Sequence, residues 1–480
     1  MNRKFVFRLL GKMLMVTSLL MVLPLIVSII YKEDCYIAFL LSIGISLAVG
    51  FPLMTFCKTD DRVIYAKEGF VIVALSWLCM SAVGALPFVL SGEIPSYIDA
   101  FFETVSGFTT TGASILTNVE ALSHGTLFWR SFTHWVGGMG VLVFIMAIIP
   151  ASTDRSIHIL RAEVPGPIVG KLVPKMRDTA IILYLIYIVL TVIEIVLLIL
   201  GGMPLYDSIV HSFGTAGTGG FGIKSDSIAS YSPYLQWVIT VFMMIFGVNF
   251  NLYYLIFTKK IKSVFRSEEL WTYIGIGIVS TVVIAFNIRD MYSSLGETIR
   301  VSSFQVSTII TTTGYATTDF NLWPDLSKTI LLLLMFIGSC AGSTAGGFKI
   351  SRVILLFKMI KREIKSLIHP RAVDVVRFEG KKVDDPVLKS LSAYFAIYVA
   401  CFIGIFLLIS FDGFDIVTNL SASAACFNNI GPGFNAVGPA ANYAGYSVFS
   451  KLVLSLAMLL GRLEIYPILF VMSRKTWAQK

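Results

Sequence analysis

Ten stretches of this 480-residue chain are apolar over 18 to 30 residues, and that feature limits its fold more than any other. A hydrocarbon core about 30 Å thick is crossed by about 20 residues of helix. Charged residues make up only 14% of the chain, against roughly a quarter in soluble proteins. The sequence therefore predicts an all-α polytopic membrane protein. The predicted crossings are 13–30, 36–56, 70–91, 126–150, 179–200, 235–257, 271–288, 329–358, 390–411 and 446–472.

The net charge of +9 comes from basic residues that lie in bursts between these stretches. This pattern indicates membrane topology and anionic lipid contact, and argues against a nucleic-acid partner. Segments 92–124 and 412–445 contain no Lys or Arg. The positive-inside rule therefore predicts a bacterial inner (plasma) membrane protein with both termini cytoplasmic and a negative outer mouth. The basic loops are the N-terminus, 57–69, 151–178, 258–269 and 359–389, the last with Lys361, Arg362, Lys365, Arg371, Arg377, Lys381 and Lys382.

Four outer loops contain a short amphipathic stretch that cannot span the membrane, followed by a polar turn with a glycine. We expect re-entrant helices over 96–110, 205–217, 299–312 and 414–428, with Gly112, Gly219, Gly314 and Gly431 at the centres of the turns. The glycines are 107, 95 and 117 residues apart, which indicates four whole membrane modules. The fold class predicted is two leading transmembrane helices plus four repeats of helix, re-entrant pore helix, filter loop and helix around one pore.

Non-helical backbone survives at membrane depth only when it is buried in protein or lines a watery cavity. Four such turns can surround one axis with carbonyl oxygens that replace the hydration shell of a cation. Glycine suits the position because it reaches positive φ without steric strain. The alternative is four ordinary surface turns, which their equivalent positions disfavour. Residues 217–222 also fit GxGxxG, but they lie in an outer loop without the strand that a dinucleotide site requires.

Segments 108–114, 135–140, 218–222, 308–319, 428–434 and 461–464 resemble the motifs of the Trk/Ktr/HKT superfamily of potassium transporters. The two leading helices resemble the Trk potassium uptake branch (TrkH/TrkG type). The resemblance implies potassium as substrate, with rubidium and more weakly sodium as further cations, and glycine at all four filter positions implies potassium selectivity. The potassium-binding filter residues it implies are Thr110, Thr111, Gly112, Thr218, Gly219, Gly220, Thr312, Thr313, Gly314, Asn429, Ile430 and Gly431.

The resemblance also divides the chain and implies partners. We expect two leading helices in 1–66 and pore repeats in 67–150, 175–260, 268–360 and 386–480. The cytoplasmic loops are too short to fold a nucleotide-binding domain. The resemblance therefore implies a homodimer regulated by a cytosolic TrkA-like nucleotide-binding subunit, while the chain itself needs no cofactor.

The span 329–358 contains ten small residues in a row, 338–347, and is too long for one straight crossing. It is either a tight helix–helix contact or an unwound segment. The resemblance implies a gate below the filter, formed by Gly338, Gly342, Gly346, Gly347 and Arg462. Arg462 is either a pore charge or half of a structural ion pair, for which Glu194 is the candidate partner. His134, Asn249 and Asn251 are expected to make hydrogen bonds between helices.

These features predict potassium uptake through a carbonyl-lined filter. The alternative is a secondary active potassium symporter coupled to protons or sodium. The fold does not distinguish such a symporter from a channel. An intramembrane enzyme is disfavoured because the spans carry no HExxH, no GxSxG and no paired aspartates. The chain is therefore not expected to be an enzyme.

Overall fold

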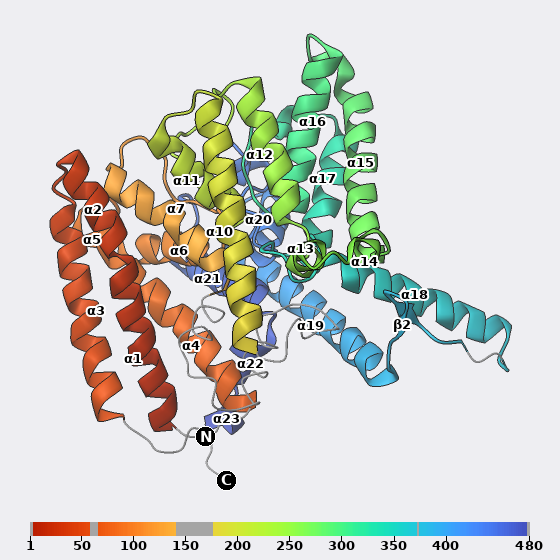
Figure 1. The fold of residues 1–480 in the computed structure, drawn as a ribbon, viewed down its shortest axis with the longest axis horizontal. Helices are drawn as coiled ribbons and strands as arrows, with labels where there is room; N and C mark the ends of the chain where they lie inside the picture. The colour runs from red at the N-terminus through yellow and green to blue at the C-terminus, as the bar shows by residue number, and fades with distance from the viewer. Residues whose placement is uncertain (1–2, 58–65, 141–175, 372–373, 478–480) are drawn as a thin grey trace.

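The computed structural model describes residues 3–57, 66–140, 176–371 and 374–477, and these are mostly helical (Figure 1). Within these described ranges, six helices are long and apolar enough to cross a membrane, or seven if one sharply bent pair counts as a span. The all-α membrane fold is therefore confirmed for the described part of the chain, apart from a hairpin of β1 (Arg377–Phe378) and β2 (Lys381–Lys382). Some predicted features lie outside the described residues. These are Lys58, Arg62, the basic residues of 151–175 and the end of the predicted span 126–150.

The chain begins with a helical hairpin of α1 (Arg3–Leu20), α2 (Val22–Tyr31) and α3 (Tyr36–Phe56), which stands at one edge of the molecule (Figure 1). The span Arg3–Tyr31 begins ten residues earlier than predicted, whereas α3 has the predicted bounds. Gly11 and Gly50 let the two helices approach closely, because a Cβ on either would lie within about 3.0 Å of the other's carbonyl oxygen.

Four groups of helices follow, each with one long helix, one short helix and further helical pieces. The first is α4 (Ala66–Gly84), α5 (Leu86–Leu90), α6 (Tyr97–Phe108) and α7 (His124–Gly138). The second is α10 (Met176–Leu200), α11 (Leu205–Ala216), α12 (Pro233–Phe246), α13 (Phe250–Phe257) and α14 (Ile261–Phe265). The third is α15 (Glu268–Ile288), α16 (Leu295–Ile310), α17 (Asp325–Ile337) and α18 (Ile350–Ile368). The fourth is α19 (Asp385–Ile409), α20 (Ile416–Phe427), α21 (Val448–Arg462), α22 (Tyr466–Met472) and α23 (Arg474–Trp477).

The short helices α6, α11 and α20 lie within three of the predicted re-entrant stretches, and α16 begins four residues before the predicted stretch 299–312. Side chains cap three of their N-termini: Ser96, Ser294 and Asp415 accept from backbone N–H groups three residues later. Each helix then ends directly at its polar turn. The long neighbouring helices hold them: α6 packs on α7 and α21, and α16 on α12 and α15.

The prediction of ten full crossings is wrong in detail, because three of the expected spans are broken. The span 235–257 bends by 89° between α12 and α13. The bend fits against the 338–347 segment, where Cys340 N–H donates to the Gly247 carbonyl (3.2 Å) and Phe250 N–H to the Gly342 carbonyl (3.0 Å). Asn249 is the N-cap of α13, accepting from Asn251 N–H (3.0 Å), and not the predicted interhelical hydrogen-bonder.

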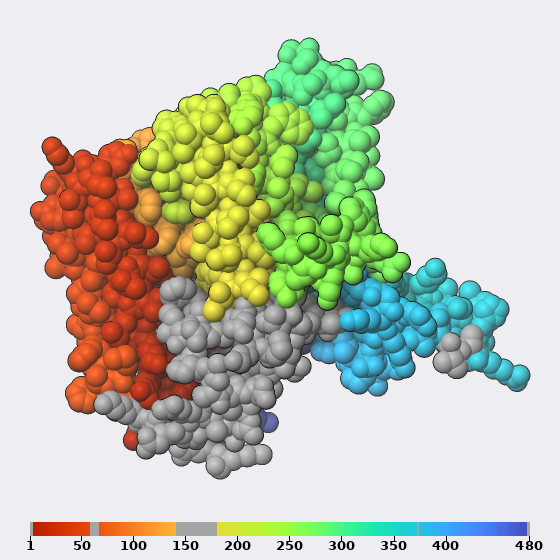
Figure 2. All heavy atoms as spheres, in the orientation of Figure 1, coloured from red at the N-terminus to blue at the C-terminus, as the bar shows by residue number. Residues whose placement is uncertain are grey.

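The other two broken spans are 329–358 and 446–472. The first was predicted to be broken, and residues 338–349 do separate α17 from α18. The second is interrupted between α21 and α22, where Glu464 and Ile465 have φ of 58° and 66°. The Glu464 carboxylate there accepts from the Arg352 guanidinium of α18, so one break is tied to the other. Beyond this point α18 extends from the body of the molecule together with the β-hairpin (Figure 2).

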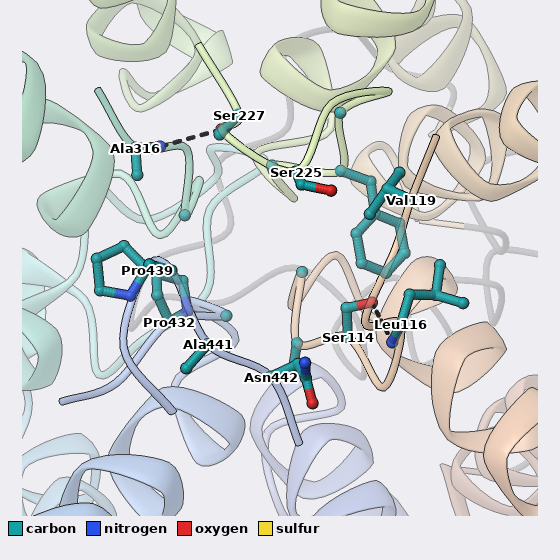
Figure 3. Close-up of a pocket in the computed structure, with 18 of the residues that line it drawn as sticks. Ser114, Leu116, Val119, Ser225, Ser227, Ala316, Pro432, Pro439, Ala441 and Asn442 are labelled. Atoms are coloured by element: carbon teal, nitrogen blue, oxygen red, sulfur yellow. Dashed lines mark hydrogen bonds between the residues drawn. The ribbon is translucent and has the colours of Figure 1, made fainter. Parts of the chain in front are cut away.

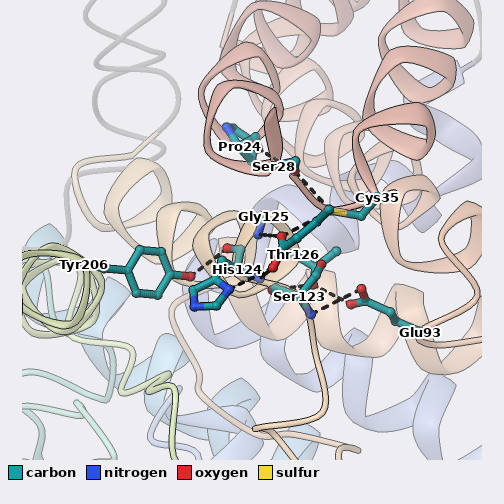
Figure 4. Close-up of polar contacts among 10 residues, drawn as sticks. Pro24, Ser28, Cys35, Glu93, Ser123, His124, Gly125, Thr126 and Tyr206 are labelled. Atoms are coloured by element: carbon teal, nitrogen blue, oxygen red, sulfur yellow. Dashed lines mark hydrogen bonds and ion pairs between the residues drawn. The ribbon is translucent and has the colours of Figure 1, made fainter. Parts of the chain in front are cut away.

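The leading hairpin is fastened to the body by a polar cluster, shown in Figure 4. Glu33 accepts from the backbone N–H of His124 (2.8 Å) and Gly125 (3.0 Å) at the start of α7, and pairs with the His124 ring (2.8 Å). Tyr31 stacks on that ring at 4.0 Å, and Tyr206 of α11 donates to the His124 carbonyl (2.6 Å). At the opposite end, Arg3 donates to the Trp477 carbonyl (2.9 Å), so both described chain ends lie on one side.

Candidate functional site: a ring of four glycine turns

The four polar turns share one backbone conformation. Two residues after the end of each short helix lies a residue with φ near +55°, namely Thr110, Thr218, Thr312 or Asn429. The N–H of that residue and of the next one donate back into the last turn of the helix, as in a Schellman motif. A β-branched residue at positive φ is strained by about 1–3 kcal/mol, so three threonines in this conformation indicate backbone positions that the surrounding structure enforces.

Two residues further on, a glycine with positive φ completes each turn. These glycines are Gly112 (80°), Gly220 (76°), Gly314 (88°) and Gly431 (98°). The predicted alignment of the second turn is therefore wrong by one residue, because Gly220, and not Gly219, is the equivalent of Gly112. Gly219 takes the place of Thr111, Thr313 and Ile430, and it is glycine for a different reason. A Cβ on Gly219 would lie within 2.5 Å of three ring atoms of His134, which stacks on Phe221 at 4.1 Å.

The glycines interlock in a closed ring. A Cβ on Gly112 would collide with the carbonyl oxygen of Gly219 in the next turn, and a Cβ on Gly220 with that of Thr313. The pattern continues in the same direction with Gly314 against Ile430 and returns to the start with Gly431 against Thr111, all within 3.0 Å. Each turn thus places its carbonyl group in the space that a side chain of the preceding turn would need. The structure brings all twelve predicted filter residues together in these turns.

Side chains also join neighbouring turns. Asn429 donates through Nδ2 to Thr111 Oγ1 (2.9 Å) and to the Met458 carbonyl (2.9 Å). Tyr315 donates to the carbonyls of His211 (2.9 Å) and Phe221 (3.3 Å). Tyr443, which follows the fourth turn, donates to the Gly431 carbonyl (2.8 Å). These bonds fix the positions of the turns relative to one another.

A buried ion pair that the sequence analysis did not identify joins the first two turns. Arg130 Nε of α7 lies 2.6 Å from Glu103 Oε1 of α6, and both side chains are almost fully buried. Glu103 also accepts from Ser114 Oγ (2.9 Å) and Ile115 N–H (3.0 Å), after the first turn. Arg130 donates to the Gly222 carbonyl (3.1 Å) and lies 3.5 Å from the centre of the Phe221 ring, after the second turn.

One face of the ring opens on a cavity of about 140 Å³ (Figure 3). All four ring glycines line it, together with residues that follow them in each repeat, including Arg130 and Lys224. Its lining contains no carboxylate, so the predicted negative mouth is wrong at this point. The acidic residues of the outer loops are used elsewhere: Asp99 pairs with Lys451 (2.6 Å), Glu120 accepts from Ser225 N–H (2.7 Å), and Asp412 accepts from Ser447 N–H (2.7 Å).

The 338–349 segment contacts the other side of the ring, through residues that precede the glycines. Gly346 N–H donates to Thr312 Oγ1 (2.7 Å), and Ser339 Oγ to the Ile310 carbonyl (2.8 Å). A Cβ on Gly346 would lie within 3.0 Å of the Asn428 carbonyl and Asn429 Cβ. The segment is irregular backbone, with positive φ at Gly338, Gly342 and Gly347, and not a helix–helix seam.

Arg462 lies beside this segment at the end of α21. Its guanidinium donates to the Thr344 carbonyl (2.7 Å) and to the carbonyls of Gly137 (2.5 Å) and Gly138 (2.8 Å) at the end of α7. The predicted alternative of an ion pair with Glu194 is wrong, because neither carboxylate oxygen of Glu194 has a hydrogen-bond partner among the described residues. Arg462 therefore links the segment to α7 through backbone oxygens.

A polytopic membrane protein in which four short helices end at one ring of carbonyl groups belongs to the class of membrane cation transporters. Comparison with known proteins agrees. The family model of TrkH, described as a cation transport protein, matches residues 37–478. The chain belongs to the TrkH family of cation transport proteins, and it is a transporter and not an enzyme.

Individual relatives are similar over the whole chain. The Trk system potassium uptake protein TrkH of Salmonella typhimurium is 36% identical, with all of both chains covered. TrkG of Escherichia coli K12 is 35% identical over 97% of each chain. The crystal structure of the potassium transporter TrkH from Vibrio parahaemolyticus superposes with a TM-score of 0.90 at 32% identity, covering both chains fully.

Proposed function

We propose that this chain takes up potassium across the bacterial inner membrane through the ring of Gly112, Gly220, Gly314 and Gly431. The observation that carries the proposal is the closed interlocking of the four turns, in which each glycine packs on a carbonyl oxygen of the next turn. Carbonyl oxygens at fixed spacing can replace the hydration shell of a potassium ion. The relatives named as potassium uptake proteins support this substrate. Rubidium, and sodium more weakly, would follow the same path.

The division into pore repeats 67–150, 175–260, 268–360 and 386–480 follows from the same turns. The C-terminal end of each short helix carries partial negative charge and stops at the ring, which favours a cation there. This matters because the cavity above the ring has no carboxylate in its lining. Attraction of the ion therefore depends on backbone dipoles.

The 338–347 segment and Arg462 form the gate of the proposed pathway. The segment bonds to Thr312 on the side of the ring away from the cavity, and Arg462 holds it through Thr344. A fixed guanidinium charge at this place opposes the exit of a cation.

The regulatory partner is a cytosolic TrkA-like nucleotide-binding subunit, and the chain acts as a homodimer with both termini in the cytoplasm. Basic residues of 361–382 lie on α18 and the hairpin, the part that extends from the body (Figure 2). Only some are neutralised within the described chain, as in Arg362–Asp385 (2.9 Å) and Lys365–Asp374 (3.1 Å). Force applied here reaches the gate directly, because α18 begins where the segment ends.

The test is the ratio of potassium to sodium permeability, from reversal potentials of purified protein in planar bilayers. Gly112→Ser and Gly314→Ser place a side chain against the carbonyl of the next turn at positive φ, so we expect the ratio to fall. Gly404→Ser on α19 is the matched control, because a Cβ there meets nothing within 4 Å. Unchanged ratios in both ring variants would contradict the filter assignment. Reversal potentials that shift with an opposed proton or sodium gradient would instead support coupled symport.

A further inference from the structure

One acidic side chain inside the membrane domain has no role in the pathway described above. Glu194 lies on α10, six residues before its end at Leu200, and is 0% exposed. The lipid-facing side of α10 carries exposed aliphatic residues such as Val192 and Val196. Glu194 lies on the opposite face, in the line of Tyr187, Thr191 and Leu198, which are all buried. That face packs on α11, the short helix that leads into the second turn of the ring.

The polar groups around Glu194 are bonded to other partners. Thr191 donates to the Tyr187 carbonyl (2.8 Å), and Tyr187 to the Trp135 carbonyl (3.0 Å). Thr215 of α11 faces the carboxyl group, but its hydroxyl donates to the His211 carbonyl (3.0 Å). Neither carboxylate oxygen of Glu194 has a hydrogen-bond partner among the described residues.

No described cationic side chain compensates Glu194. Helices α12 and α13, which also pack on α10, carry no charged residue. On α11, His211 Nδ1 bonds to the Asp207 carbonyl (2.8 Å), and the Asp207 carboxylate accepts from Tyr231 (2.9 Å). On α7, Arg130 is paired with Glu103 and His134 stacks on Phe221. From the third turn, only the phenol of Tyr315 interacts electrostatically with Glu194.

A carboxylate that is buried without a partner strongly favours its protonated form. Glu194 is linked to the second turn of the ring through Thr215, which is five residues before Gly220 and whose carbonyl accepts from Thr218 N–H (3.0 Å). A cation in the ring would supply the positive charge that the carboxylate lacks, and in a medium of low dielectric constant this interaction is strong.

We infer that Glu194 is an intramembrane proton-binding site linked to cation occupancy of the ring. The inference rests on the proposed function, since the linked cation is the potassium ion of the filter. Potassium binding breaks the O–H bond of the Glu194 carboxyl group and releases the proton to water, leaving the carboxylate. By thermodynamic reciprocity, loss of the proton raises the affinity for potassium to the same extent.

The experiment measures rubidium or potassium influx into liposomes as a function of pH between 5.5 and 9. The apparent KM of the parent should fall as pH rises, by at most about tenfold per pH unit for one linked proton. Glu194→Gln keeps the shape of the neutral acid, so its KM should stay at the low-pH parental value at every pH. Glu194→Asp should restore part of the dependence. Glu297→Gln, an exposed carboxylate bonded to Ser293 (2.6 Å), is the matched control and should behave as the parent.

A second measurement does not depend on flux. Adding potassium to the purified protein should remove the infrared band of a protonated carboxylic acid in the parent and leave the spectrum of Glu194→Gln unchanged. A parental KM that is constant with pH, or the same pH dependence in Glu194→Gln, would overturn the proton site alone. Absence of any potassium flux in the parent would instead refute the proposed function.

Discussion

The buried pair of Glu103 and Arg130 gives a sharp test of how the ring is held. Arg130→Met keeps the length of the side chain and removes its charge, its 2.6 Å bond to Glu103 and its contact with Phe221. Removing one partner of a buried ion pair lowers stability by about 3–5 kcal/mol, because the other charge stays buried and unpaired. We therefore expect Arg130→Met to lower the free energy of unfolding by about that amount.

Glu103→Gln is the complementary change. It keeps the side-chain shape and an oxygen that can accept the hydrogen bond from Ser114, and it leaves the Arg130 charge unpaired. The two changes act on one pair, so the double variant should be less destabilised than the sum of the single variants by about 2 kcal/mol, within the range for contacting residues. The assay is denaturant unfolding in detergent micelles, followed by circular dichroism. Arg289→Met is the matched control: Arg289 pairs with Asp290 at 3.4 Å, but both side chains are largely exposed, and such pairs contribute about 0–1 kcal/mol.

The pair also makes a prediction about selectivity. Because it joins residues after the first turn to residues after the second, its loss should let Gly112 separate from the Gly219 carbonyl. The potassium to sodium permeability ratio should therefore fall in both single variants and not in Arg289→Met. The reasoning is refuted if Arg130→Met unfolds within about 1 kcal/mol of the parent, a loss typical of an exposed pair, or if the effects of the two changes add.

Three further predictions concern other parts of the chain. Arg462→Ala, or deletion within 338–347, should raise potassium flux in liposomes without changing the permeability ratio; unchanged flux would make both purely structural. Partial burial alone would raise the pKa of Glu33, but hydrogen bonds from His124 and Gly125 lower it below its usual value. The stabilisation by Glu33 is therefore complete above its unfolded pKa of about 4.3 and is lost as pH falls through the lower folded pKa. When Tm is measured against pH, it should drop on the acid side in the parent, and it should drop less in Glu33→Gln. ATP, ADP or NADH should change flux only when the soluble partner is present, and charge reversal across 361–382 should weaken co-purification; a nucleotide response of this chain alone would contradict the model of regulation.

The sequence was sufficient where one element's own residues decide its structure. The helix α3 has the predicted bounds because its apolar length alone sets them, and three of the four short helices lie within the predicted stretches, while α16 begins four residues early. The glycine turns were recognisable because a positive φ at membrane depth selects glycine. These features needed no knowledge of the neighbouring helices.

The sequence was insufficient where a distant segment decides the structure. The 89° bend between α12 and α13 lies in an apolar run with no proline, and it is set by hydrogen bonds of Gly247 and Phe250 to the 338–347 segment. The pairing of Glu103 with Arg130 was missed because the residues lie on different helices, 27 positions apart. Glu103 lies in segment 92–124, which the sequence assigned to a negative outer mouth, whereas the fold buries its side chain.

The second turn shows why equal backbone geometry does not imply equal residues. In the first and third turns, hydroxyl pairs brace the turn from within: Thr109–Thr111 and Thr311–Thr313, both at 2.8 Å. The second turn has no such pair, because Gly219 leaves the space to His134 from the first repeat. The arrangement of the four turns requires only that their carbonyl groups be held in place. The imidazole of His134, from another repeat, can therefore substitute for a local hydroxyl. The sequence alignment of the second turn was therefore wrong by one residue. The error lies at Gly219, where His134 of the first repeat supports the turn.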